Sequence, residues 1–285
     1  MSHTLTTPDG IALALRTWAP PHSPRGQVLL VHGLGEHMGR YEALAQALVA
    51  QGWVVQAYDQ RGHGSSGGGR GQMAAQDSLL ADLGQVLQHV RSTASAGPLI
   101  LLGHSLGGLV AARYVAEGLQ AAPAPWWQAV DGLVLSSPAL DAGMTAVQKL
   151  LTAVVSRVAP NLAVGNGLNP NDICRDAAVV QAYRADPLVH DRISGRLARF
   201  IADAGPWVEA RAPHWQTPTL LMWAGADRCV NPAGAVRFAA TAPAARLSAQ
   251  TWPALAHEIF NEPERAAVVA SLLAWLLPRA TPKAP

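Results

Sequence analysis

A serine flanked by glycines lies at residues 103–107 (GHSLG), between an apolar run and a helix-forming run. The apolar run, residues 99–102 (LILL), is typical of a buried strand, and residues 109–116 (LVAARYVA) favour a helix. In a strand–turn–helix unit of this kind, the serine lies at the tip of a sharp turn and exposes its hydroxyl. The helix that follows adds backbone N–H donors near a developing negative charge. We therefore predict that Ser105 is a nucleophile.

A second stretch, residues 64–68 (GSSGG), matches the same pattern around Ser66. It does not directly follow a strand, and the glycines after it disfavour a helix. We therefore predict that Ser66 belongs to a loop and has no catalytic role.

A serine hydroxyl is a poor nucleophile until a base removes its proton, and a histidine base needs a carboxylate to hold its tautomer. Asp227 follows a predicted strand at residues 219–223, and His257 lies in the loop after the next predicted strand, residues 247–252. The order serine, aspartate, histidine is one that such triads adopt, and both loops lie at the same edge of the sheet as Ser105. We predict that Asp227 is the acid and His257 the base.

Other acidic and imidazole side chains are weaker candidates for these roles. Asp59 precedes the serine and lies in a glycine-rich turn, residues 59–64 (DQRGHG), which favours a compact hydrogen-bonded turn over a metal site. His32 and His63 also lie in turns, and His104 is expected to point away from its neighbour Ser105. The remaining candidates lie in or next to the segment between residues 140 and 213 and have no assigned role: Asp186, Asp191, Asp203, His190 and His214.

Acyl transfer at a serine also requires two N–H donors for the oxyanion. We predict that they are the backbone amides of Leu106, directly after the nucleophile, and of Leu34, where Gly33 lets the backbone approach the substrate. The sequence has no HExxH metal motif, no paired CxxC motifs and no dinucleotide-binding glycine pattern. We therefore expect neither a cofactor nor a metal.

The candidate residues lie in loops between predicted strands and helices. These strands and helices alternate along the chain, which indicates an α/β fold with a mostly parallel central sheet and helices on both faces. In such sheets, functional sites lie beyond the carboxyl ends of the strands. The predicted strands cover residues 11–18, 27–31, 53–58, 99–102, 132–135, 219–223 and 247–252, and the predicted helices lie near residues 41–51, 78–91, 109–116, 233 onward and 263–277.

The alternation stops between residues 140 and 213, which are predicted to be helical and irregular with no clear strand. We interpret residues 140–213 as an inserted helical cap, and residues 1–139 together with 214–285 as the core. Apolar residues at helical spacing across residues 146–158 favour packing of this helix against the core, with contact with a lipid surface as the alternative.

Composition narrows the class of protein. The chain has 285 residues, about half of them apolar, and a net charge of +2 without runs of Lys or Arg, so no nucleic-acid partner is expected. The first ten residues are polar and do not form a signal peptide, and no stretch is apolar enough to span a membrane. Cys174 and Cys229 are expected to be free thiols. These features favour a cytoplasmic protein; the oligomeric state is left open.

Motifs along nearly the whole chain resemble the monoacylglycerol lipase and lysophospholipase group of α/β-hydrolases. The resemblance implies a serine hydrolase with a helical cap that cleaves a small-molecule acyl ester, most simply a fatty-acyl ester of glycerol. It supports Ser105, Asp227 and His257 as the triad, and the amides of Leu34 and Leu106 as the oxyanion hole. The motifs are residues 32–37 (HGLGEH), Arg40, Tyr41, 58–66 (YDQRGHGSS), 103–108 (GHSLGG), 137–140 (SPAL), Tyr183, 186–189 (DPLV), 225–228 (GADR) and 257–262 (HEIFNE).

The resemblance does not extend to residues 143–168, so the acyl chain length and the alcohol group remain open. Cys229 is similar in position to thiols near the site in some relatives. A carboxylesterase, thioesterase or lysophospholipase is an alternative on the same triad. An aminopeptidase would need carboxylates in the cap to capture an ammonium group, and a non-catalytic binding protein is the remaining alternative. The carboxylates available for that capture are Asp186, Asp191, Asp203 and Glu209.

Overall fold

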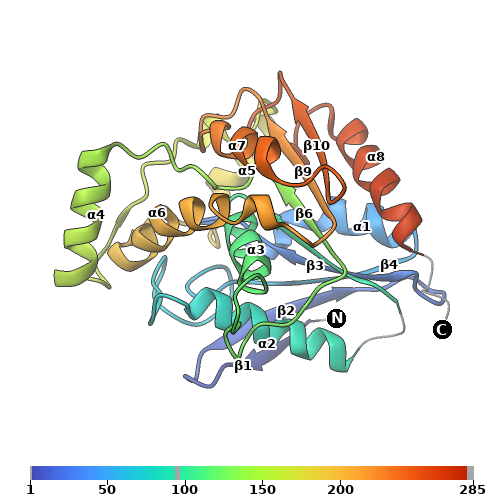
Figure 1. Cartoon of the computed structure of the whole chain (residues 1–285), viewed down its shortest axis with the longest axis horizontal. Helices are drawn as coiled ribbons and strands as arrows, with labels where there is room; N and C mark the ends of the chain where they lie inside the picture. Colours follow the sequence, from blue (N-terminus) through green and yellow to red (C-terminus); the bar gives the residue numbers. More distant parts are fainter. Residues whose placement is uncertain (1, 94–96, 281–285) are drawn as a thin grey trace.

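A single eight-stranded sheet runs through the centre of the computed structural model, which describes residues 2–93 and 97–280 (Figure 1). Six adjacent strands of this sheet are parallel, namely β4, β3, β5, β6, β9 and β10, and β1 and β2 are antiparallel to their neighbours. Every residue of the central strands β3, β5 and β6 is buried, as their continuous apolar runs require. The strands in spatial order are β1 (Ser2–Thr6), β2 (Ala12–Trp18), β4 (Trp53–Tyr58), β3 (Gly26–Val31), β5 (Leu99–His104), β6 (Gly132–Ser136), β9 (Thr219–Ala224) and β10 (Leu247–Trp252).

Helices cover both faces of this sheet, so the predicted α/β architecture is confirmed. One face packs against α1 (Glu42–Ala50) and α8 (Arg265–Leu276). The other packs against α2 (Ser78–Ser92), α3 (Leu106–Glu117) and α7 (Ala233–Thr241) (Figure 1). Short 3-10 helices lie at Met38–Tyr41, Pro170–Asp172, Ala212–His214 and Leu277–Arg279.

Strand β1 lies in the polar first ten residues, for which the sequence indicated no element. It pairs with β2 in an antiparallel hairpin, with Thr6 opposite Ala12. An edge strand of this kind carries few apolar residues, so alternation does not reveal it.

The segment between β6 and β9 contains α4 (Ala146–Val158), β7 (Ala163–Gly165), α5 (Ala177–Ala185), β8 (Arg192–Ser194) and α6 (Gly195–Glu209). The expectation that it holds no strand is wrong, because β7 and β8 form a small antiparallel pair. Strands of three residues are too short to show an alternating pattern. Helix α6 packs on α3 and α7 and supports α4, which lies at one end of the molecule (Figure 1).

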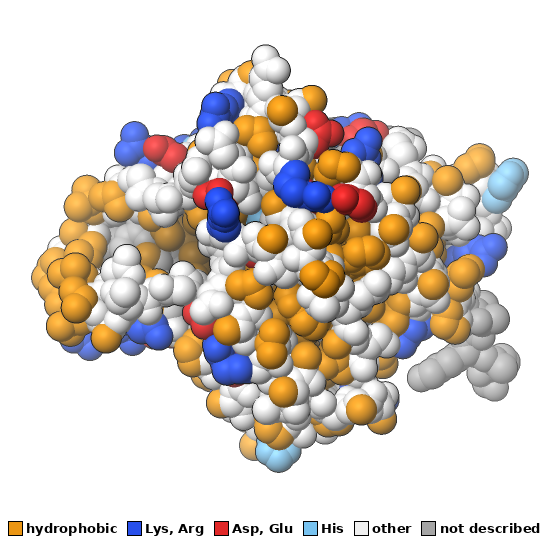
Figure 2. Space-filling model, turned by 90° about the horizontal axis from the view of Figure 1, so that it is seen from above, with side chains coloured by type: hydrophobic (Ala, Val, Ile, Leu, Met, Phe, Trp, Pro, Cys, Tyr) orange, Lys and Arg blue, Asp and Glu red, His pale blue; other side chains and the backbone are white. Residues whose placement is uncertain are grey.

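The apolar side of α4 faces solvent, so the favoured expectation that it packs against the core is wrong. A capping box at Thr145 and Gln148 starts the helix, and none of its residues is buried. The side that faces the molecule is instead half-buried around Thr152 and Ser156, where Val155 packs on Gly195 of α6. The exposed residues are Val147, Leu150, Leu151, Val154 and Val158, each 50–76% exposed. Figure 2 shows apolar side chains gathered at this end of the molecule.

In the described part of the chain, no helix combines the length and the apolar character that a membrane span requires.

Candidate active site

Ser105 lies between β5 and α3 with a backbone φ of +54°, a strained value for a residue with a side chain. Its amide donates to the Ser136 carbonyl at 3.0 Å. The flanking glycines allow the turn, because a Cβ on Gly103 would lie 2.3 Å from the Gly107 carbonyl oxygen. A Cβ on Gly107 would lie 2.1 Å from the Val31 carbonyl oxygen. The strand–turn–helix unit predicted from the sequence is therefore present.

Asp227 and His257 meet beyond the ends of β9 and β10. The His257 Nδ1 lies 2.7 Å from Asp227 Oδ2, and the two side chains are 6% and 1% exposed. The other carboxylate oxygen of Asp227 accepts the amides of Cys229 and Val230 at 2.8 and 3.0 Å, which fixes the carboxylate. An ionised carboxylate at Nδ1 holds the proton there and leaves Nε2 as the acceptor.

The pKa of His257 lies above its ordinary value. Burial by itself would lower this pKa, but the charge of Asp227 and its hydrogen bond to the ring outweigh the effect of burial. Asp227 thus stabilises the imidazolium that forms when the ring accepts a proton.

His104, the residue before Ser105, lies beside the predicted base His257. The rings of His104 and His257 lie 4.7 Å apart between centroids. Nδ1 of His104 lies 3.1 Å from the Ser136 hydroxyl. Burial is the main cause that lowers the pKa of His104, to about 3, so the ring is neutral. Within residues 2–93 and 97–280, no hydrogen bond joins the Ser105 hydroxyl to His257.

The loop after β3 lies directly against Ser105. A Cβ on Gly33 would be 3.1 Å from the Ser105 Cβ, and the Gly33 amide donates to Glu36 Oε1 at 2.6 Å. Leu34 and Leu106, the two residues with predicted oxyanion amides, line the same cavity as Ser105.

A buried ion network beside this loop was not predicted from the sequence. Arg40 donates to Glu36 at 2.7 Å and to both oxygens of Glu258, the residue after His257, at 2.5 and 2.8 Å. The Tyr41 hydroxyl also donates to Glu36. Burial opposes ionisation of Glu36, but Arg40 and the surrounding donors hold its pKa at about 2. The signal was a glutamate four residues before an arginine, and a second glutamate beside the predicted base.

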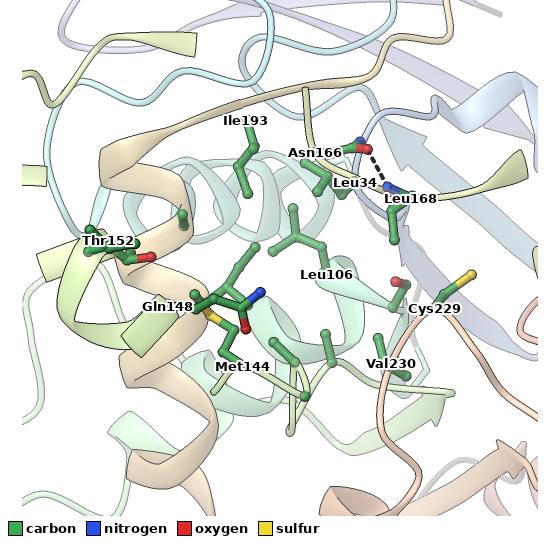
Figure 3. A pocket seen from close by; sticks show the side chains of 17 residues that line it. Leu34, Leu106, Met144, Gln148, Thr152, Asn166, Leu168, Ile193, Cys229 and Val230 are labelled. Atoms are coloured by element: carbon green, nitrogen blue, oxygen red, sulfur yellow. Dashed lines mark hydrogen bonds between the residues drawn. The ribbon is translucent and has the colours of Figure 1, made fainter. Parts of the chain in front are cut away.

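A cavity of about 430 Å³ opens over Ser105. Most of its lining is apolar and comes from the loops of the sheet and from α4, β8 and α6. Figure 3 shows the labelled side chains around it, with Leu106 near the centre and Cys229 at its edge. The polar side chains on its wall are neutral: Ser105, Gln148, Thr152, Asn166 and Cys229. Among the described residues that line this cavity, none is a carboxylate.

The weaker candidates have structural contacts away from this cavity. Asp59 accepts the amides of Met38 and Ser65, both at 2.8 Å. Ser66 is a loop residue, as predicted, and its hydroxyl donates to the Asp59 carbonyl. Nε2 of His32 accepts the Gln60 amide at 2.9 Å.

Four of the acidic residues between 140 and 213 contact basic side chains. Asp186 pairs with His37, Asp191 with Arg192, and Asp203 with Arg199. Glu209 pairs with Arg237. The ring of His190 stacks on His63 at 4.7 Å, and His214 ends a 3-10 helix.

Cys174 and Cys229 are free thiols, as predicted. Cys229 is the closer to the site, because one ligand atom from each of Asp227, Cys229 and His257 lies within 4.8 Å of the others. In the described part of the chain, these three residues form a group whose donor atoms could hold a metal ion.

Comparisons with known proteins agree with this architecture. Residues 22–264 match the family described as serine aminopeptidase, S33. The chain is 32% identical to a monoacylglycerol lipase of Mycolicibacterium smegmatis over 96% of each chain. It is 35% identical to the human monoglyceride lipase, covering 81% of this chain and 75% of that protein. The crystal structure of a Paleococcus ferrophilus monoacylglycerol lipase superposes with a TM-score of 0.82 at 33% identity, over 94% of this chain and 99% of that one. The chain therefore belongs to the monoacylglycerol lipase group of α/β-hydrolases and is a serine ester hydrolase.

Proposed function

We propose that Ser105, Asp227 and His257 form a catalytic triad that hydrolyses monoacylglycerols to fatty acid and glycerol. The observation that carries the proposal is the buried Asp227–His257 pair, 2.7 Å between Oδ2 and Nδ1, beside a strained serine that opens into an apolar cavity. That arrangement supplies a base with a fixed tautomer, an exposed nucleophile and room for an acyl chain.

In the proposed reaction, His257 Nε2 takes the proton of the Ser105 hydroxyl as its oxygen attacks the ester carbonyl. The amides of Leu34 and Leu106 donate to the oxyanion, and the bond to the alcohol breaks as His257 returns the proton to the departing oxygen. Water, deprotonated by the same ring, then attacks the acyl-enzyme and releases the fatty acid. The Ser105 hydroxyl and the His257 ring need to form their hydrogen bond only when substrate fills the cavity, because catalytic hydrogen bonds commonly tighten in the bound complex.

The proposed substrate class rests on the cavity and on the relatives. A largely apolar cavity of about 430 Å³ suits an acyl chain, and its few neutral polar groups suit an uncharged alcohol such as glycerol. The relatives from Mycolicibacterium smegmatis and human bear the names monoacylglycerol lipase and monoglyceride lipase.

We further propose that residues 140–213 act as a cap over this cavity, and that the exposed face of α4 contacts the lipid surface from which substrate is drawn. Two features of α4 support this: its apolar side chains are exposed, and the helix also lines the cavity through Gln148, Leu151 and Thr152. A helix in this position links the lipid surface to the cavity.

An aminopeptidase is the alternative that the family description brings forward. It would need a negative charge to capture the substrate ammonium group, and no described residue that lines the cavity is a carboxylate. The acidic residues weighed for that role, Asp186, Asp191, Asp203 and Glu209, are engaged with basic side chains elsewhere.

The test is a set of initial rates on monoacylglycerols of graded acyl length, on p-nitrophenyl esters and on aminoacyl arylamides, with Ser105→Ala as control. We expect a preference for long-chain glycerol esters, with Ser105→Ala slower by several orders of magnitude. Good turnover of short esters with negligible glyceride cleavage would make the protein a general carboxylesterase. Arylamide cleavage would favour the aminopeptidase. Retained activity in Ser105→Ala would refute the nucleophile.

A further inference from the structure

A third side chain that can bind metals lies beside the proposed acid and base of the site. The pair of Asp227 Oδ2 and His257 Nδ1 is joined by the thiol of Cys229, and one ligand atom from each residue lies within 4.8 Å of the others. Carboxylate oxygen, thiolate sulfur and imidazole nitrogen are the ligand types that zinc takes in proteins. Ester hydrolysis at a serine needs no thiol here, so the reaction leaves Cys229 without a role.

The spacing of these donors is close to what a tetrahedral cation requires. Zinc holds nitrogen and oxygen ligands about 3.3 Å apart and sulfur and nitrogen ligands about 3.6 Å apart. The contact between Asp227 and His257 is 2.7 Å, so these two ligand atoms must move apart by about 0.6 Å to hold one ion, and a ligand atom of Cys229 lies within 4.8 Å of both residues. Three protein ligands leave the fourth position for water.

The negative charges around Cys229 favour the binding of a divalent cation. Burial raises the pKa of the Cys229 thiol, and the negative charges of Asp227, Glu258 and Asp172 raise it further. The same carboxylates that keep the thiol protonated attract a divalent cation, which then displaces the thiol proton into solvent. Cys229 also lies at the edge of the cavity that holds Ser105, so an ion can arrive by the route that substrate takes (Figure 3).

We propose that Asp227, Cys229 and His257 form an inhibitory site for a zinc-like divalent cation. The inhibition, though not the binding, rests on the proposed role of His257 as base. Coordination at Nδ1 moves the ring proton from Nδ1 to Nε2, while the thiol loses its proton to solvent. With Nε2 protonated, the ring no longer accepts the proton of Ser105, and acylation stops. Removal of the ion reverses both steps.

The test uses Co²⁺ as a spectroscopic probe of the full-length protein, because a thiolate ligand gives cobalt a charge-transfer band in the near ultraviolet. Wild type is compared with Cys229→Ala, with Cys229→Ser, and with Cys174→Ala as the matched control that removes the other free thiol. We expect the band at one Co²⁺ per chain in wild type and in Cys174→Ala, and its loss in both Cys229 variants. Circular dichroism verifies that each variant is folded.

Zn²⁺ inhibition of p-nitrophenyl ester hydrolysis is measured alongside. Wild type and Cys174→Ala should lose activity and regain it with a chelator, whereas Cys229→Ala should need about tenfold or more Zn²⁺ for half-inhibition, since one of three ligands is gone. Mg²⁺, which prefers oxygen ligands, should inhibit none of them. A missing cobalt band in wild type, or a band that survives Cys229→Ala, overturns the proposal. A band in a protein without esterase activity would uphold the metal site and refute the proposed function instead.

Discussion

Arg40 Nη1 lies 2.7 Å from Glu36 Oε2 and 2.5 Å from Glu258 Oε1, so one guanidinium group joins the loop after β3 to the residue beside His257. Glu36 in turn accepts the Gly33 amide, and Gly33 packs on Ser105. The loop that carries the proposed oxyanion amide and the loop that carries the proposed base therefore share one buried ion network.

Arg40→Gln should destabilise the protein, because it leaves two buried carboxylates without their counter-charge. Loss of one partner from a buried pair costs about 3–5 kcal/mol. Urea unfolding measures this cost. Arg16→Gln is the matched control: Arg16 pairs with the half-exposed Glu42, and its loss should cost about 1 kcal/mol or less. Equal unfolding midpoints for the two variants would contradict a structural role for the network.

Glu36 should also set the acid limb of stability. Its pKa is about 2 in the folded protein against 4.5 for the free side chain. Because the folded-state pKa is depressed, the stabilisation is fully present above pH 4.5 and is lost as the pH falls from 4.5 through 2. The shift corresponds to about 3 kcal/mol.

Glu36→Gln should therefore flatten the fall in unfolding free energy between pH 4.5 and 2, measured by denaturant titrations at several pH values. Asp191→Asn, which changes an exposed carboxylate, should leave the slope as in wild type. The same steep slope in Glu36→Gln as in wild type would show that another group titrates.

Much of the fold follows from local sequence. Strands such as β3 and β5 are largely apolar runs that end at the loops of the candidate site, and the turn at Ser105 is marked by glycines where an added Cβ would press on backbone atoms. Strand β1 was missed because its only strongly apolar residue is Leu5, and β7 and β8 because three residues carry no period.

Periodicity predicts that one side of a helix is apolar, but it does not predict whether that side faces the protein or the solvent. The spacing in α4 predicted a helix with the observed bounds, but its apolar side faces solvent while Thr152 and Ser156 face the molecule. Similarly, the order of Ser105, Asp227 and His257 suggested a site. The convergence of Arg40 with Glu258, and of Cys229 with His257, depends on loops far apart in sequence.

Gly107→Ala tests the packing of the turn at Ser105. A Cβ at this position would lie 2.1 Å from the Val31 carbonyl oxygen and 2.4 Å from that of His32, both rigid backbone atoms. The variant should unfold at lower denaturant and label slowly with a fluorophosphonate, since β3 and α3 must move apart. Gly165→Ala in β7 is the control, because its nearest neighbour would be 3.9 Å away. Wild-type labelling in Gly107→Ala would contradict the close approach.

The exposed face of α4 provides the test of lipid contact. Val154 and Val158 are 50% and 76% exposed and do not line the cavity, so charges placed there should affect the lipid surface and not the chemistry. The double variant Val154→Glu, Val158→Glu should bind vesicles more weakly and cleave vesicle-borne monoacylglycerol about tenfold more slowly, because two valines are no longer buried in lipid. Its rate on a water-soluble p-nitrophenyl ester should stay close to that of wild type. Val236→Glu, which charges an equally exposed valine on α7, should leave both rates unchanged. If the double variant lost both rates equally, α4 would act on the cavity itself, and if it lost neither, the apolar face would have no part in reaching the lipid.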